Sequence, residues 1–131
     1  MTTRLCMFVF LLAFAGCSSI DFSEIDGGSY GDYPFEGELE AKAEQYLERV
    51  LFDPESRRIR WVDKEPKKSA LWTGLLNDGW VYGWTKRFGL NAKNRFGGYT
   101  GEKAYFVMIA STGTLYVNEM PADNMLQVSD L

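Results

Sequence analysis

The sequence predicts an α+β domain in which one N-terminal helix packs on an antiparallel sheet of four to five strands. Apolar residues between positions 36 and 51 recur with the 3.6-residue period of a helix face. From residue 58 onward, short β-prone segments follow one another, separated by charged or glycine-containing turns. A helix followed by consecutive strands with short connections is most simply satisfied by one helix lying across an antiparallel sheet.

The chain of 131 residues begins with a segment typical of export. Residues 1–16 combine one basic side chain, Arg4, with an uncharged run of eleven residues from Leu5 to Ala15. Eleven residues rise about 16 Å as a helix, too short for a bilayer core of ~30 Å. We therefore expect residues 1–16 to be a signal peptide rather than a membrane span. A buried N-terminal helix of a cytosolic protein is the alternative.

The run ends in Phe14-Ala15-Gly16-Cys17, followed by Ser18. This resembles the lipobox of bacterial lipoproteins, although Phe14 stands where that family usually carries leucine. The resemblance implies cleavage before Cys17, diacylglycerol on its thiol and acylation of the new amine, and two or more acyl chains anchor a protein stably. Ser18 implies sorting to the outer membrane of a Gram-negative envelope, facing the periplasm. An ordinary secretory signal is the alternative interpretation.

Residues 17–35 mix glycine, serine and aspartate with scattered aromatics, which predicts a flexible tether behind the lipidated cysteine. A globular domain is expected over residues 36–120, beginning with the helix. That helix should end at Asp53-Pro54, because proline disfavours helical dihedrals in the residue before it. The predicted apolar face of the helix comprises Leu39, Ala43, Tyr46, Leu47, Val50 and Leu51.

Strands are expected from the alternation of side chains and from β-prone composition. Residues 64–69 form a charged loop between the first two strands, and Asn77-Asp78-Gly79 predicts a hairpin turn. Gly83 and Gly89 are candidate bend sites within a long aromatic strand, and residues 121–131 form a C-terminal tail without a strong pattern. The expected strands are 58–62, 70–76, 80–90, 103–110 and 114–117.

Composition excludes several chemistries. The chain has no histidine, so a Ser-His-Asp triad and histidine-ligated zinc are impossible. Of its two cysteines, Cys6 would leave with the signal and Cys17 would become a thioether, so the mature domain would have no free thiol. We expect no metal, no cofactor and no catalytic residue.

Charge divides along the chain. Residues 18–55 hold 11 acidic and 2 basic side chains, whereas residues 56–103 hold 11 basic and 4 acidic ones. A basic middle segment can indicate nucleic-acid binding. We do not expect a nucleic-acid partner, because an exported chain would rarely meet one and the acids of the helix can lie beside the bases of the sheet.

Two motifs carry a further resemblance. Asp53-Pro54-Glu55-Ser56 follows the helix, and N-A-K-N-R-F-G-G-Y-T-G occupies residues 91–101. Together they resemble a group of small exported bacterial and phage-associated proteins with D-P-x-S and N-A-K-N-x-F-G-G-Y-x-G motifs, many of them predicted lipoproteins. These proteins often have a cysteine shortly before the second motif, where this chain has residues 88–90, Phe-Gly-Leu. The group has no established activity, so the resemblance implies export and leaves function open.

The second motif supplies the candidate binding residues. Its glycines allow positive φ or close backbone approach, and exposed amides beside cations can hold an anion. A purely structural turn is the alternative, and the spacing matches no known phosphate loop. The candidate residues are Lys93, Arg95, Gly97, Gly98, Tyr99 and Lys103.

The aromatic residues Trp80, Tyr82 and Trp84 alternate onto one face of the predicted strand. We expect this face to pack against the helix. An exposed aromatic patch that stacks on sugars or anchors a partner is the alternative.

The sequence is compatible with three functions. The first is a lipid-anchored, non-enzymatic module that binds an envelope protein or glycan. The second is a phage- or plasmid-type exclusion or inhibitor lipoprotein. The third, less favoured, is a carboxylate enzyme that cleaves glycans. The acids of its basic half, Asp63, Glu65, Asp78 and Glu102, form no recognisable pair by spacing.

Overall fold

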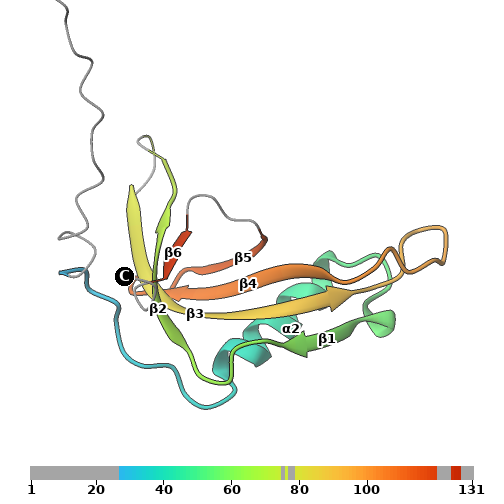
Figure 1. Ribbon diagram of the computed structural model, residues 1–131, viewed down its shortest axis with the longest axis horizontal. Helices are drawn as coiled ribbons and strands as arrows, with labels where there is room; N and C mark the ends of the chain where they lie inside the picture. The colour runs from blue at the N-terminus through green and yellow to red at the C-terminus, as the bar shows by residue number, and fades with distance from the viewer. Residues whose placement is uncertain (1–26, 75, 77–78, 121–124, 128–131) are drawn as a thin grey trace, which may run out of the picture.

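The computed structural model describes residues 27–74, 76, 79–120 and 125–127. The predicted signal peptide, Cys17 and Asp78 lie outside these residues. The α+β prediction is confirmed: one helix packs against an antiparallel sheet (Figure 1). Within the described ranges, no helix is both long and apolar enough to cross a membrane.

Among the described residues the sheet has six strands, more than the four to five expected; five follow the order β5-β4-β3-β2-β6, while β1 pairs separately with β3. All pairings are antiparallel. The elements are α2 (Glu38–Val50), the 3₁₀ turn η1 (Pro54–Ser56), β1 (Arg58–Trp61), β2 (Lys67–Trp72), β3 (Trp80–Asn91), β4 (Lys103–Ala110), β5 (Leu115–Glu119) and β6 (Met125–Gln127).

The long strand β3 organises the sheet. Its two halves pair with different strands along one edge, β2 with the first half and β1 with the second, and β4 pairs along the other edge. The chain changes from β1 to β2 opposite Arg87, whose carbonyl accepts a hydrogen bond from the N–H of Val62 at 2.9 Å. One strand therefore connects the helix-covered end of the sheet to the opposite end.

The helix packs as its apolar period predicts. Leu39, Ala43 and Leu47 are buried against Phe88 and Val107 of the sheet. Lys86 is buried on the same face and donates a hydrogen bond to Glu40 of the helix, so an acid of the helix does lie beside a base of the sheet. The helix ends at Val50, ahead of the proline in η1.

Alternate residues of each strand point to the opposite face of the sheet. That face is also apolar. Leu71, Val81, Phe106, Met108 and Ala110 form a second buried cluster there. Both faces of β4 are therefore buried, which agrees with its continuous run of apolar residues.

The boundaries of β2 differ from the expectation. The strand begins at Lys67 and ends at Trp72. Part of the predicted charged loop, residues 67–69, is therefore strand, whereas the expected strand continued to residue 76. Ser69 is fully buried, and its hydroxyl shares a 2.6 Å hydrogen bond with that of Thr85. This partner on β3 makes a polar residue suitable for the interior. Three residues of the expected tail form β6, which pairs with β2.

The segment before the helix corrects two predictions. Among residues 27–35, Tyr30 is buried with its ring 5.6 Å from that of Tyr82, and Tyr33 packs edge-on against Trp84 at 4.9 Å. The described part of the predicted tether is thus packed on the sheet. The aromatic face of β3 meets this segment at Tyr82 and Trp84, rather than the helix. Alternation along a strand defines a face but not the element that covers it.

Candidate binding site

The loop between β3 and β4, residues 92–102, projects at one end of the domain (Figure 1). It contains five of the six predicted binding residues. Lys93 and Tyr99 form an isolated antiparallel bridge that continues the hairpin beyond the sheet. Gly97 has a φ of 80°, a conformation that favours glycine. The chain therefore turns tightly at the tip of this loop, hereafter the hairpin loop.

Asn94 holds the tip together. Its side-chain oxygen accepts hydrogen bonds from the N–H groups of Phe96, at 2.9 Å, and Gly98, at 3.2 Å. Its backbone N–H donates to the Gly98 carbonyl, and its carbonyl accepts from the Gly97 N–H, both at 2.9 Å. The amides of Phe96, Gly97 and Gly98 are thus engaged within the loop. Binding of an anion at this loop stays a prediction, and these three amides are not free to take part in it.

Ser56 anchors the base of the hairpin loop. Its hydroxyl donates to the Asp53 carbonyl at 2.7 Å and accepts from the N–H of Lys93 at 2.9 Å. Its carbonyl accepts a hydrogen bond from the hydroxyl of Tyr99 at 3.0 Å. The two motifs that the sequence places far apart thus form one hydrogen-bonded unit.

Two cations lie over the ring of Tyr99. The guanidinium carbon of Arg58 is 4.1 Å from the ring centroid, and the ammonium of Lys93 is 5.7 Å from it. Such cation–π contacts hold long basic side chains near an aromatic face. Lys93, Tyr99 and Arg58 therefore form a positively charged platform beneath the tip.

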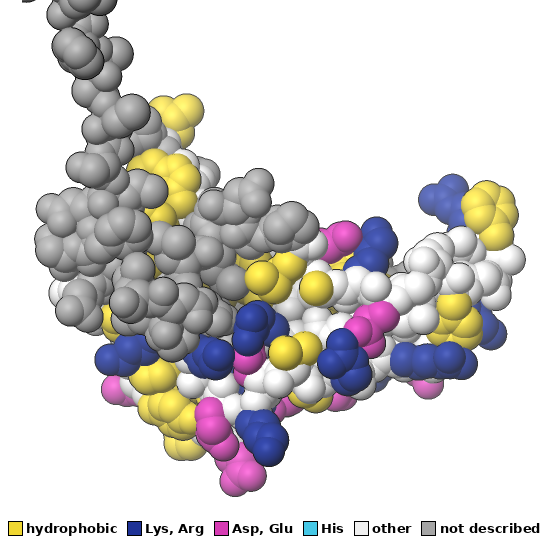
Figure 2. Space-filling model, viewed as in Figure 1, with side chains coloured by type: hydrophobic (Ala, Val, Ile, Leu, Met, Phe, Trp, Pro, Cys, Tyr) yellow, Lys and Arg dark blue, Asp and Glu magenta, His cyan; other side chains and the backbone are white. Residues whose placement is uncertain are grey.

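The tip itself is exposed. Phe96 is 89% exposed, and its neighbour Arg95 is also exposed. A β-carbon added at Gly97 or Gly98 would meet nothing within 4 Å. Figure 2 shows a hydrophobic and a cationic group together at this end of the molecule. The loop therefore presents one aromatic and one guanidinium group on a backbone that its own hydrogen bonds define.

Lys103 does not belong to this site. It is the first residue of β4, pairs with Leu90 and forms an ion pair with Glu119 at 3.4 Å. Sequence proximity to the glycines suggested a shared role, but strand pairing places its charge beside β5.

Two residues of the site were missed as binding candidates. Phe96 was noted only as part of the motif, although an aromatic between arginine and two glycines in a turn has few apolar neighbours to pack against. Arg58 lies in the strand expected over residues 58–62 and was not among the candidates. Its position over Tyr99 depends on the pairing of β1 with β3, which local pattern does not specify.

Asp63, one of the acids considered for catalysis, is engaged by Arg87. It is buried and accepts hydrogen bonds from the Arg87 backbone N–H at 2.8 Å and from its guanidinium at 2.8 and 3.0 Å. Burial alone would raise the pKa of Asp63, but these hydrogen bonds and the charges of Arg87 and Lys67 lower it below its ordinary value. The carboxylate joins the β1–β2 connection to β3.

Two further acids also have partners. Glu102 accepts from the Nε of Arg60 at 3.1 and 3.2 Å, and this pairing lowers the pKa of Glu102. Glu65 accepts a hydrogen bond from the Tyr33 hydroxyl at 3.0 Å. Partial desolvation and this bond raise the pKa of Tyr33. These carboxylates belong to three separate contacts rather than to a facing pair.

At the base of the hairpin loop, the side-chain oxygen of Asn91 is buried without a hydrogen-bond partner. Within the described part of the chain, no group of three or more potential metal ligands gathers.

Comparison of the chain with protein-family models, curated proteins and solved structures finds no match.

Proposed function

We propose that this chain is a lipid-anchored envelope lipoprotein that acts as a non-enzymatic interaction module. Acyl chains on Cys17 hold it to the membrane, and the hairpin loop contacts a protein partner in the envelope. The observation that carries this proposal is the exposure of Phe96, at 89%, beside Arg95 on a loop fixed by Asn94 and Ser56.

The physical logic is that of an anchor residue. An exposed phenylalanine gains most when it enters an apolar pocket, and aromatic and arginine side chains contribute much of the energy of protein interfaces. Because Asn94 and Ser56 already order the backbone, binding would cost little conformational entropy. A convex tip requires a concave partner. The cations of Arg95, Lys93 and Arg58 favour a partner whose pocket has an acidic rim.

The shape of the domain suits presentation of this loop. The first described segment, drawn in blue, begins at the opposite end of the domain from the hairpin loop (Figure 1). If the chain before residue 27 leads to a membrane anchor, the domain is attached at one end and the hairpin loop lies at the other. This arrangement supports a role for the loop in reaching a partner in the periplasm.

Affinity capture from solubilised envelopes tests this role. The wild type, Phe96→Ala and Arg95→Glu serve as baits, with Phe52→Ala as the matched control because Phe52 is 72% exposed and lies outside residues 92–102. We expect a discrete protein captured by the wild type and the control and lost with both loop variants. Equal capture by all four baits would remove the hairpin loop from the proposal.

A second candidate is an exclusion or inhibitor lipoprotein of phage or plasmid type. The convex, internally hydrogen-bonded hairpin loop supports it, because such a loop can block a concave active site or channel mouth. Expression of the chain should then reduce phage adsorption or DNA entry, and unaltered infection would remove this candidate.

A glycan-cleaving enzyme is less favoured because Asp63 and Glu102 are held in ion pairs. A zymogram on peptidoglycan that shows clearing would restore it.

A further inference from the structure

We propose that the segment 33–35, Tyr-Pro-Phe, is the centre of a second binding site, and that its ligand is a glycan strand of uncharged or N-acetylated sugars. This segment, hereafter the aromatic ridge, precedes the helix and lies between two pockets. It shares no residue with the hairpin loop, so this inference holds or fails independently of the function proposed above.

The aromatic ridge exposes two rings on a fixed backbone. Tyr33 is 53% exposed and Phe35 is 84% exposed, whereas Pro34 between them is buried. The N–H of Phe35 donates to the carboxylate of Glu38 at 3.1 Å, and its carbonyl accepts from the N–H of Glu38 at 3.0 Å. The start of the helix thus determines the path of the ridge.

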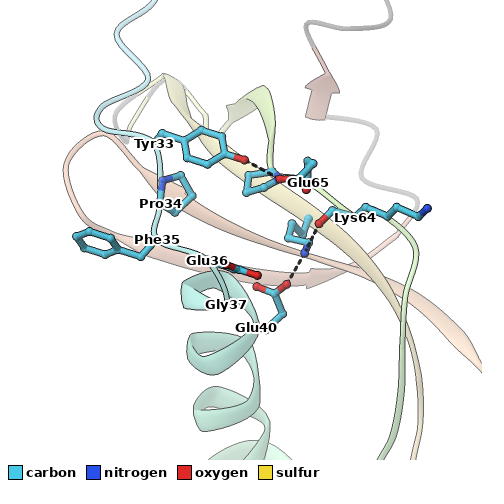
Figure 3. Close-up of a pocket in the computed structure, with 10 residues that line it drawn as sticks. Tyr33, Pro34, Phe35, Glu36, Gly37, Glu40, Lys64 and Glu65 are labelled. Carbon is cyan, nitrogen blue, oxygen red and sulfur yellow. Dashed lines mark hydrogen bonds and ion pairs between the residues drawn. The ribbon is translucent and has the colours of Figure 1, made fainter.

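The orientation of the Tyr33 ring is also determined. It packs against Trp84 with the two ring planes at 73°, and its hydroxyl donates to Glu65 (Figure 3). The indole N–H of Trp84 donates in turn to the carbonyl of Gly31 at 3.3 Å. A ring held at its edge and at its hydroxyl loses little freedom when a ligand stacks on its exposed surface.

A pocket of about 340 Å³ lies on one side of the ridge, as Figure 3 shows. Glu40 and Lys86 form an ion pair at its wall, and Lys86 also donates to the carbonyl of Lys64 at 2.8 Å. Glu36 and Glu65 also line this pocket. The carboxylates of Glu36, Glu40 and Glu65 therefore line this pocket together with Lys64 and Lys86.

A second pocket, of about 280 Å³, lies on the other side of the ridge. Asp32, Glu38, Trp84 and Ser111 contribute to its lining. Tyr33, Pro34 and Phe35 line both pockets. Each pocket is near the lower limit of small-molecule sites. The pair, separated by an aromatic ridge, fits a chain of small units better than one large ligand.

The chemistry of the lining selects the ligand class. Sugar rings present apolar C–H faces that pack on aromatic rings, and hydroxyl groups that donate to carboxylates. The acidic residues that line the two pockets outnumber the basic ones, Lys64 and Lys86, and this balance disfavours a polyanion. An extended peptide gains affinity by adding to a strand edge, but the ridge lies outside any strand. A glycan without negative charge can stack on the rings, donate to the carboxylates and avoid repulsion by the acids.

Binding of tetrasaccharides to the full-length protein, purified in detergent, tests the site. The probes are tetra-N-acetylchitotetraose and cellotetraose, and their binding is followed by the intrinsic tryptophan fluorescence of the protein and by NMR line broadening of the sugar. We expect a Kd of roughly 1 mM or below for at least one of them. We expect Phe35→Ala and Tyr33→Ala to weaken it by roughly tenfold or more.

The controls separate the two sites. Phe52→Ala and Phe96→Ala should bind the sugar as the wild type does, so loss of partner capture by Phe96→Ala leaves this result unaffected. Tyr33→Phe should weaken binding less than Tyr33→Ala, since it keeps the ring and loses only the bond to Glu65. Absence of binding to both sugars, or an equal loss with Phe52→Ala, would overturn the inference. Binding of an oligolysine peptide instead, abolished by Phe35→Ala, would also overturn it, in favour of a cationic peptide.

Discussion

The hydroxyl of Ser56 accepts a hydrogen bond from the backbone N–H of Lys93, 2.9 Å away across 37 positions of sequence. Ser56 ends the 3₁₀ turn that follows the helix, and Lys93 lies at the base of the hairpin loop. The bond therefore ties the exit of the helix to the base of the loop. The first motif supports the second, and the second presents Phe96.

Ser56→Ala should loosen the hairpin loop without unfolding the domain. The substitution removes one acceptor and one donor at a partly buried position, which we expect to cost about 1–2 kcal/mol of unfolding free energy. Urea unfolding measures the cost, and hydrogen exchange should show faster exchange at the Lys93 amide. Thr112→Ala, at an exposed turn, is the control and should change stability by less than about 0.5 kcal/mol. Unchanged exchange at Lys93 would show that the bond does not order the loop.

Two glycines of β3 should respond differently to alanine. A β-carbon at Gly83 would lie 2.2 Å from the Ile109 carbonyl oxygen and 2.8 Å from the Ala110 α-carbon. Because backbone cannot move aside, Gly83→Ala should cost about 3 kcal/mol or more. At Gly89 the clash is with the carboxylate of Glu102, the far end of an exposed side chain, at 2.3 Å.

We therefore expect Gly89→Ala to displace Glu102 from Arg60 and to lower the thermal unfolding midpoint much less than Gly83→Ala does. Exposed ion pairs contribute little to the free energy of unfolding. Alanine within a strand also costs less conformational entropy on folding than glycine does. Differential scanning calorimetry of the two variants provides the comparison. Equal losses would show that the Arg60–Glu102 pairing across Gly89 matters more to the fold than its exposure suggests.

Stability should fall in acid through Asp63. Its pKa is lower in the folded chain than the unfolded value of about 3.9. The stabilisation is therefore fully present above that unfolded value and is lost as the pH falls through the folded pKa. Unfolding free energies measured between neutral pH and strong acid should show this loss.

The matched variant is Asp63→Asn. It should lower stability at neutral pH by about 2–3 kcal/mol, less than a fully buried pair because the side chain of Arg87 is 34% exposed. The difference in stability between wild type and variant should shrink as the pH falls. A difference that stays constant across the acid range would contradict the assigned role of the Asp63 charge.

Asn91→Val should stabilise the domain. The side-chain oxygen of Asn91 is buried without a partner, and valine suits an extended strand. We expect a gain of about 0.5–1 kcal/mol in urea unfolding, since an unpaired buried acceptor costs free energy. Asn118→Val, at an exposed strand position, should change stability by less. A loss with Asn91→Val would indicate that the amide makes an essential bond.

Local pattern was sufficient for most of the elements. The 3.6-residue period of Leu39, Ala43 and Leu47 predicted both the helix and its buried face, because one face of a helix is defined by nearby residues. The alternation at residues 58–62 and the run at 103–110 predicted strands for the same reason. The limits of β2 were not predictable this way, since the hydroxyl of the buried Ser69 finds its partner in Thr85 on β3, a contact that depends on strand pairing.

The site was predictable in its residues and not in its connections. The glycines and cations of residues 91–101 indicated the hairpin loop, but pairing across the sheet separates Lys103 from it and brings Arg58 to Tyr99. Likewise the aromatic ridge lies in a segment rich in glycine and aspartate, a composition typical of a tether. The ring contact of Tyr33 with Trp84 is long-range and leaves no trace in local sequence.

In-cell photo-crosslinking at position 96 tests the central claim most directly. A benzoylphenylalanine at Phe96 is compared with the same group at Phe52, in chains that carry Cys17 or Cys17→Ala. We predict one discrete protein adduct from position 96, none from position 52, and loss of the adduct when Cys17 is replaced. The same pattern of adducts from both positions, or no adduct from position 96 in the acylated chain, would contradict a lipid-anchored module that binds through its hairpin loop.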